Sequence, residues 1–253
     1  MKVHVLDGGR IRLRKWELFD PSLEQGEERW LSNPCYLIEH AVGTLLWDTG
    51  LPDFARTHES GFPVGDIAVF HVSRSLKDQL TEIGRPPESI DFVALSHMHS
   101  DHVGNLGLFK TSRLLVQSDE YAIAFGENAA ASGLDPASYT PARTMKVVDY
   151  LGDLDVFGDG SVVVKRFPGH TPGSQALLLR LPETGAVLLS GDLAHSRANW
   201  SNRTVPVGNV DAAQTVKSLD AADELCRREN ATVWVQHDLD QYEQIVDKST
   251  TYR

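Results

Sequence analysis

The sequence predicts an α/β protein built from two stacked sheets with helices on their outer faces. Short apolar runs typical of strands occur in both halves of the chain, and each half also carries a helical pattern of apolar residues. The order in each half is strands, helix, strand. Stacking two such sheets buries their apolar faces while helices cover the outer ones. With 253 residues, of which 41% are hydrophobic, we expect one domain over residues 1–253 with a large core.

The first half is expected to begin with strands and to continue with a helix. Gly, Pro and polar residues dominate 52–65, which is therefore predicted to be a loop. A helical pattern follows, with Leu76, Leu80 and Ile83 on one face, and Gly84 is expected to end it. The strands expected in this half are 2–6, 11–15, 35–39, 44–47, 92–95 and 114–117.

The second half repeats this arrangement. Ser118 is expected to cap a helix that runs to Phe125, and Asp211 to cap one that runs to about Glu229. Residues 126–141 are rich in Ala, Gly, Ser and Pro and are predicted to form a mobile cover. The strands expected here are 162–167, 175–181 and 187–189, with 232–235 as the last strand of the chain.

Composition and charge narrow the class of protein. The net charge of -11 argues against unspecific binding to nucleic acid. Cys35 and Cys226 lie far apart and outside any CxxC pattern, which indicates buried thiols in a reducing compartment. No signal peptide and no apolar run of roughly 20 residues is visible, so the expectation is a cytoplasmic protein without a membrane partner.

Histidines and aspartates gather directly after expected strands, where a sheet holds side chains rigidly. The run from His97 to His102 has the pattern H-x-H-x-D-H, which is costly in a core without a metal. Zinc accepts such nitrogen and oxygen ligands. Alternate residues of an extended run point to opposite sides, so this run can serve two ions, and a carboxylate such as Asp192 can bridge them. The candidate metal ligands are His97, His99, Asp101, His102, His170, Asp192 and His237.

The remaining histidines lack this setting. His4, His40, His58 and His71 are interpreted as structural or solvated. A lone H-x-H pair is usually a surface or core feature, and His237 alone is a weak signal that gains weight from following a strand.

Together these residues resemble the metal motifs of the metallo-β-lactamase superfamily, as do Asp48-Thr-Gly50 and the Gly-His-Thr-Pro-Gly run around His170. The resemblance implies an αβ/βα four-layer sandwich that holds two divalent ions, most commonly Zn²⁺. It also implies that Asp48 supports the metal loops by hydrogen bonding. The implied ligands are His97, His99 and His170 for one ion, Asp101, His102 and His237 for the other, and Asp192 as the bridge.

Within the superfamily, the chain is most similar to the N-acyl homoserine lactone lactonases, which act in quorum quenching. Its length, the Asn33-Pro-Cys-Tyr-Leu-Ile-Glu run and the final Val-Gln-His-Asp carry this similarity. The implied reaction is hydrolysis of a small lactone by a monomer or homodimer, with Asp101 orienting the nucleophile and passing its proton to the leaving group. One departure is His195, which stands where familiar members have a substrate-contacting tyrosine. His195 could donate a hydrogen bond to the substrate from there, or it could be a bystander.

Other functions share parts of this pattern. Thioesterases similar to glyoxalase II carry a sizeable helical region after the last ligand, whereas only 238–253 follow His237 here. A non-catalytic zinc protein is a further alternative, although structural zinc sites are usually closed and rich in Cys. The apolar part of a substrate needs a hydrophobic groove, and each aromatic candidate for it is also compatible with core packing. These candidates are Trp16, Phe19, Trp30, Phe62, Phe70 and Trp200.

Overall fold

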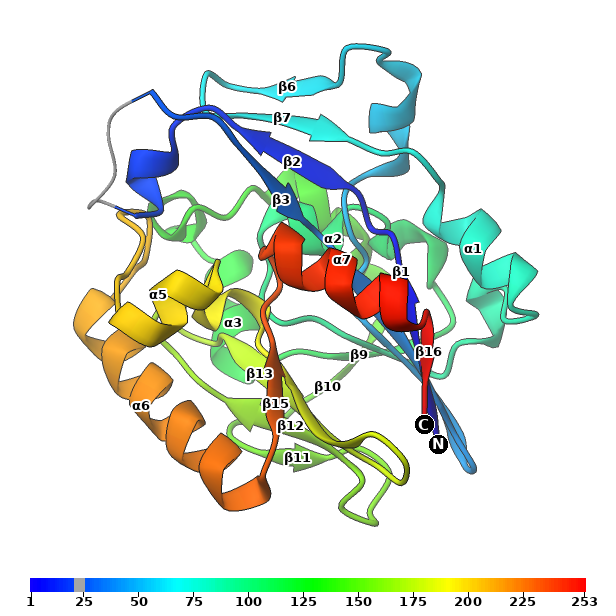
Figure 1. Ribbon diagram of the computed structural model, residues 1–253. Coiled ribbons are helices and arrows are strands. Elements are labelled where there is room, and N and C mark those ends of the chain that lie inside the picture. Colours follow the sequence, from blue (N-terminus) through cyan, green and yellow to red (C-terminus); the bar gives the residue numbers. More distant parts are fainter. Residues whose placement is uncertain (21–25) are drawn as a thin grey trace.

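The computed structural model describes residues 1–20 and 26–253. It contains two stacked mixed sheets with a third, smaller sheet beside them (Figure 1). The predicted fold class is confirmed, and the third sheet is an addition that the sequence pattern did not indicate.

The larger sheet has seven strands among the described residues, in the order β10-β9-β8-β5-β4-β1-β16. The neighbours β5, β8, β9 and β10 are parallel, whereas β4, β1 and β16 join antiparallel. The strands are β1 (Lys2–Leu6), β4 (Cys35–His40), β5 (Gly43–Trp47), β8 (Phe92–Ala94), β9 (Arg113–Leu115), β10 (Lys146–Val148) and β16 (Thr251–Tyr252).

The second sheet has five described strands in the order β11-β12-β13-β14-β15, and only the last pair is parallel. Side chains alternate between its two faces, as a strand requires. Leu177 and Leu179 pack toward the larger sheet, and Leu178 packs on the opposite face. The strands are β11 (Leu154–Asp155), β12 (Val162–Arg166), β13 (Gln175–Leu181), β14 (Gly185–Leu189) and β15 (Thr232–Trp234).

Helices cover the outer faces of both sheets. Leu76 and Leu80 of α1 pack on the larger sheet, and Leu219 of α6 packs on the second one. Asp211 caps α6 as predicted, because its side chain accepts a hydrogen bond from the Gln214 N–H at 2.8 Å. The helices are α1 (Leu76–Glu82), α2 (Ser100–Val103), α3 (Ser118–Ala124), α4 (Pro136–Tyr139), α5 (Arg197–Asn202), α6 (Ala212–Glu229) and α7 (Leu239–Lys248).

The small sheet has the strand order β3-β2-β7-β6 and its own hydrophobic cluster. It corrects the prediction of a loop over 52–65, which instead contains a 3₁₀ helix (Asp53–Thr57) and the whole of β6. The strands are β2 (Arg10–Leu13), β3 (Arg29–Ser32), β6 (Phe62–Val64) and β7 (Ala68–His71).

Three further expectations need correction. Gln117, not Ser118, is the residue before α3, and Ser118 is the first residue of the helix. The segment 126–141 is not merely a cover, because Leu134 and Tyr139 belong to the hydrophobic core under the larger sheet. The strand at 232–235 is not the last strand, since β16 follows it after α7. Among the described residues, none of the helices combines the length and apolar character needed to cross a bilayer.

Candidate metal centre

The predicted ligands meet at the carboxyl ends of parallel strands. His97 follows β8 in the larger sheet, while Asp192 follows β14 and His237 follows β15 in the second. His170 comes from the loop between β12 and β13. Because the two sheets are stacked, these ends face one another, and residues far apart in sequence become neighbours.

The first cluster is formed by His97, His99, His170 and one oxygen of Asp192. Nε2 of His97 lies 2.8 Å from Nδ1 of His99 and 3.2 Å from Nε2 of His170. Oδ2 of Asp192 is 3.4 Å from Nε2 of His170 and 3.8 Å from Nε2 of His97. Four ligand atoms around a zinc ion at about 2.0 Å stand roughly 3.3 Å apart, so these spacings suit a tetrahedral site.

The second cluster shares Asp192 through its other oxygen. Oδ1 of Asp192 lies 3.3 Å from Nε2 of His102 and 3.1 Å from Nε2 of His237. Oδ2 of Asp101 completes the group, at 3.4 Å from the His102 nitrogen and 3.6 Å from the His237 nitrogen. One carboxylate therefore faces both clusters, with one oxygen toward each.

The outer nitrogens of these imidazoles are held by hydrogen bonds. Nδ1 of His102 donates to Asp48 at 2.8 Å, and Nε2 of His99 donates to the Ser132 carbonyl at 3.0 Å. A proton on the outer nitrogen leaves the inner nitrogen with a free lone pair, which is the form that binds a metal.

Two further rings are held in the same way. Nδ1 of His170 donates to the side-chain oxygen of Asn209 at 3.0 Å, and Nδ1 of His237 donates to the Ser32 carbonyl at 2.8 Å. None of Asn209, Ser132 and Ser32 was predicted from the sequence. Two of them act through backbone carbonyls, which leave no residue-type signal in a sequence.

Unpartnered atoms test whether a metal pair fits here. Among the described residues, Nε2 of His102 and Oδ1 of Asp192 are buried without a hydrogen-bond partner, and they lie 3.3 Å apart. Buried polar groups without partners are costly, and a cation between them satisfies both. The donor set of imidazoles and carboxylates is also the one that zinc prefers. The residues present therefore fit two divalent ions.

Burial and charge set the protonation of the cluster. Burial lowers the pKa of His97 and lowers that of His170 to about 3, which keeps both rings neutral. Burial also disfavours charged His102 and His237, but the nearby carboxylates, Asp192 among them, outweigh it and raise the pKa of both.

His195 lies against this centre. Its ring is buried, and Nε2 is 3.2 Å from Oδ2 of Asp192. Phe19 contacts it edge-on at 4.8 Å between ring centroids, and the ring stacks on His237 at 5.4 Å. Within the part of the chain that the structure describes, its Nδ1 has no hydrogen-bond partner. Burial lowers the pKa of His195, which favours the neutral ring.

A largely apolar cavity of about 470 Å³ opens onto the two clusters. Phe19 and Phe70, two of the predicted groove residues, line it, and Asp101 and His195 lie at its inner end. The remaining apolar side chains of the lining are those of Ile11, Leu13, Leu18, Leu31, Val64, Ile67, Ala68, Pro206 and Val207.

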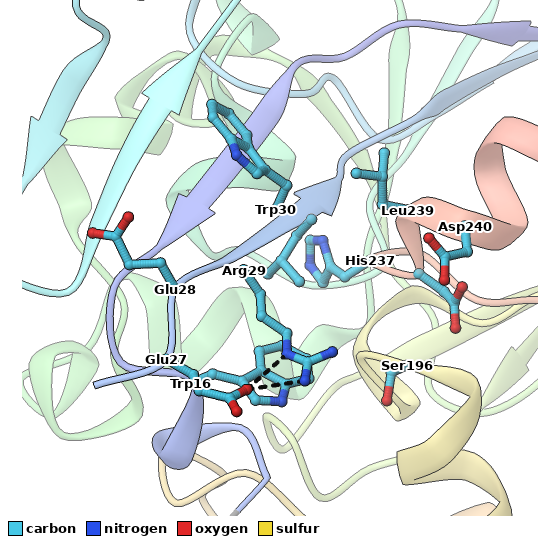
Figure 2. A pocket seen from close by; sticks show the side chains of 11 residues that line it. Trp16, Glu27, Glu28, Arg29, Trp30, Ser196, His237, Leu239 and Asp240 are labelled. Carbon is cyan, nitrogen blue, oxygen red and sulfur yellow. Dashed lines mark hydrogen bonds and ion pairs between the residues drawn. The ribbon is translucent and has the colours of Figure 1, made fainter. Parts of the chain in front are cut away.

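A second cavity of about 450 Å³ is lined in part by two other predicted groove residues (Figure 2). Trp16 and Trp30 line it together with the ion pair of Arg29 and Glu27. Leu31 and His237 line both cavities.

Two aromatic candidates lie elsewhere. Phe62 packs against the hydrophobic cluster of the small sheet and contacts Phe54 edge-on. Trp200 packs against the cluster under α6. Neither belongs to the lining of the two cavities described above, so a substrate contact by these two residues stays a prediction.

Comparison with known proteins places this centre in a family. The sequence profile of the Metallo-beta-lactamase superfamily matches residues 29–237, which include every predicted metal ligand. The chain belongs to the metallo-β-lactamase superfamily. Two relatives in this superfamily are N-acyl homoserine lactonases, from Rhizobium radiobacter (AttM, 28% identical) and from a Bacillus species (29% identical). Each match covers 95% of this chain and 94% of the relative.

Solved structures of superfamily members superpose on this chain along nearly its whole length. Bacillus thuringiensis AiiA with N-decanoyl-L-homoserine at its active site superposes with a TM-score of 0.84 and 26% identity, over 96% of this chain and 95% of that one. An N-acyl homoserine lactone hydrolase with N-hexanoyl-L-homoserine at its catalytic metal centre gives the same TM-score, identity and coverage.

Proposed function

We propose that this protein is a dinuclear metal-dependent lactonase that opens the ring of N-acyl homoserine lactones. The observation that carries the proposal is the shared carboxylate of Asp192, which joins two ligand clusters at the inner end of an apolar cavity. The lactonase relatives, which match along nearly the whole chain, support the substrate class.

In this proposal His97, His99 and His170 hold one Zn²⁺ ion, Asp101, His102 and His237 hold the other, and Asp192 bridges them. Two divalent ions in such a site polarise a carbonyl oxygen and lower the pKa of a water molecule toward neutrality. Asp48 contributes indirectly, because its carboxylate fixes the ring of His102.

Asp101 has the position required of a proton carrier. Both Asp101 and Asp192 line the cavity where the lactone ring would lie, but the Asp101 side chain is 17% exposed and that of Asp192 is 4% exposed. Asp101 is therefore the more accessible of the two carboxylates. A carboxylate there can orient the attacking water and deliver a proton to the ring oxygen as the C–O bond breaks.

His195 is proposed to donate a hydrogen bond to the carbonyl oxygen of the substrate. It lines the cavity beside the metal clusters and is neutral, so one ring nitrogen carries a proton. A donor aimed at the oxygen that gains negative charge stabilises the transition state. The imidazole would then replace the tyrosine that familiar lactonases carry there.

The acyl chain is proposed to lie along the cavity wall formed by Phe19, Leu18 and Val207. These side chains come from the segments before β3 and before α6, and the Val207 N–H donates to the Leu18 carbonyl at 2.8 Å. An apolar wall with polar groups at one end fits an amphipathic ligand whose ring is the reactive part.

A pH-indicator hydrolysis screen tests the proposal. Purified, zinc-loaded protein is assayed with N-acyl homoserine lactones, other γ- and δ-lactones, thioesters and β-lactams, while bound metal is quantified. We expect the highest kcat/KM on acyl homoserine lactones and two ions per chain. Preference for thioesters would favour a glyoxalase II-like activity, and metal binding without hydrolysis would indicate a non-catalytic zinc protein.

A further inference from the structure

Glu120 is a buried carboxylate at the beginning of α3, outside both ligand clusters. Its exposed fraction is 0%. Oε1 accepts a hydrogen bond from the Met98 N–H at 3.0 Å, and Oε2 accepts one from the Gly173 N–H at 3.0 Å. The two oxygens therefore bind two different segments of the chain.

These two segments supply all three histidines of the first cluster. Met98 lies between His97 and His99, and Gly173 lies three residues after His170. A single side chain thus joins the loop that follows β8 to the loop that precedes β13, immediately behind the histidines that must converge.

The second cluster is held by other groups. His102 is bound by Asp48, and His237 by the Ser32 carbonyl. The backbone carbonyl of Asp101 accepts from the side chain of Asn33 at 2.8 Å. The hydrogen bonds of Glu120 go to other segments than these. The two clusters do share one neighbour, because Oγ of Ser96 lies 3.1 Å from Nδ1 of both His97 and His102. We therefore expect loss of the Glu120 hydrogen bonds to weaken the first cluster more than the second.

The packing around Glu120 leaves little freedom. A Cβ atom at Gly173 would stand 2.3 Å from Cβ of Glu120 and 2.7 Å from its backbone nitrogen. Such distances are not tolerated, so even an alanine at 173 must push the loop away from α3. Both backbone donors also require acceptors, and the carboxyl group of Glu120 offers one oxygen to each of them.

We propose that Glu120 is a positioning residue that sets the spacing of His97 and His99 against His170, and thereby governs metal affinity at the first cluster selectively. This inference rests on the proposed dinuclear function. Hydrogen-bonding partners behind metal ligands typically change metal affinity by about 10- to 100-fold, and we expect an effect of that order here.

Three variants test separately the charge of Glu120, the length of its side chain and the spacing of the two loops that it joins. E120Q keeps the length but presents an amide NH₂ to one of the two N–H groups. E120D keeps the charge but withdraws it by one methylene. G173A leaves Glu120 unchanged and forces the loops apart. The matched control is D91N, since Asp91 likewise accepts a backbone N–H, from Thr44 at 2.8 Å, but lies at the opposite end of β8.

The measurement is a Zn²⁺ titration of the metal-free full chain, monitored by calorimetry and by the ¹⁵N chemical shifts of the imidazole rings. In all three variants, we expect Zn²⁺ affinity to fall about 10- to 100-fold in the binding step that shifts the ring signals of His97, His99 and His170. Affinity in the step that shifts the signals of His102 and His237 should change by less than about threefold. D91N should leave both steps unchanged.

Two outcomes would overturn the inference: equal weakening of both steps in the variants, which indicates a general structural role, or affinities equal to wild type. A wild-type protein that binds fewer than two ions would instead refute the dinuclear function on which the inference rests. The two failures are thus distinguishable in one experiment.

Discussion

Asp48 and His102 form a buried hydrogen bond of 2.8 Å between the carboxylate Oδ2 and the ring Nδ1. The other carboxylate oxygen of Asp48 accepts from the Ser96 N–H at 2.7 Å, next to the metal-binding run. Asp48 adopts this position at the end of β5 with a φ of 56°, a left-handed conformation that aspartate and asparagine tolerate better than most residues.

Replacing Asp48 by asparagine is expected to weaken metal binding without unfolding the protein. Asparagine accepts the same backbone angles, so the substitution isolates the charge and the hydrogen bond to His102. We expect zinc affinity to fall about 10- to 100-fold, measured by competition with a chelator. Unchanged affinity in D48N would show that His102 does not need this partner.

Asp101 is predicted to act on turnover more than on binding. With zinc in excess to offset the loss of a ligand, D101N is expected to lower kcat on the order of 10²- to 10⁴-fold, with KM within about threefold of wild type. Steady-state kinetics on a hexanoyl homoserine lactone measure this. A defect confined to KM would contradict a role in proton transfer.

His195 can be tested by exchanging its ring. H195F removes the donor and is expected to lower kcat by about 10²-fold, the usual effect of losing one oxyanion donor. H195Y restores a hydroxyl donor and is expected to recover most of the rate. If H195F turns over as fast as wild type, His195 is a bystander.

The apolar wall can be altered at Val207, because this side chain lines the cavity yet is 67% exposed. V207D is expected to raise KM for decanoyl homoserine lactone about tenfold or more, and to change KM for the butanoyl compound little. The reason is that the introduced carboxylate must lose its hydration where the longer acyl chain packs on it, which costs free energy. V42D is the control, since Val42 is 73% exposed in the turn between β4 and β5. Equal effects of V207D on both substrates would argue against an acyl chain at this wall.

Stability should depend on pH through Glu39. Burial raises the pKa of this carboxyl, but hydrogen bonds from His4 at 2.9 Å and Arg85 at 2.6 Å outweigh burial and hold it below its ordinary value. A lowered folded-state pKa means that the stabilisation is complete above the unfolded-state pKa and is lost as the pH falls through the folded one.

Glu39→Gln is therefore expected to destabilise the fold by about 0.5 kcal/mol at pH 7 and by nothing in strong acid, measured by urea unfolding across pH. E82Q serves as the control, because Glu82 pairs with Arg74 on an exposed surface. A Glu39→Gln deficit that persists at low pH would refute this electrostatic origin.

The positions of the metal ligands could be predicted from sequence because most stand directly after short apolar strands. Four of the seven lie within six consecutive residues, and three imidazoles and a carboxylate in one such run are the ligand types that zinc binds. The stacked sheets could be predicted as well, since residues such as Leu45 and Trp47 alternate with Leu46 between the two core faces.

The small sheet could not be predicted in the same way. Its strand β3 contains Arg29 and Trp30, both exposed, and only three or four residues pair with each neighbouring strand. Strands this short depend on partners distant in the sequence, which local propensity does not reveal. By contrast, the start of α7 carries a local signal, because Asp238 accepts a hydrogen bond from the Gln241 N–H as a helix cap does.

Glu120 illustrates a second reason why part of the site could not be predicted from the sequence. In the run Ser-Asp-Glu-Tyr a glutamate is typical of an ordinary helical surface, and nothing nearby in sequence needs its two acceptors. Its donors lie 22 and 53 residues away. Residues that support ligands from a distance become visible only when the loops are brought together.

Leu31 and His237 each line both cavities, so the two cavities adjoin at these side chains. Shortening Leu31 is expected to join the two volumes and give a bulky substituent access to the compartment that holds Trp16 and Trp30. The breadth of ligands that such an enzyme admits could then be widened at one position of β3, without altering any group that binds metal.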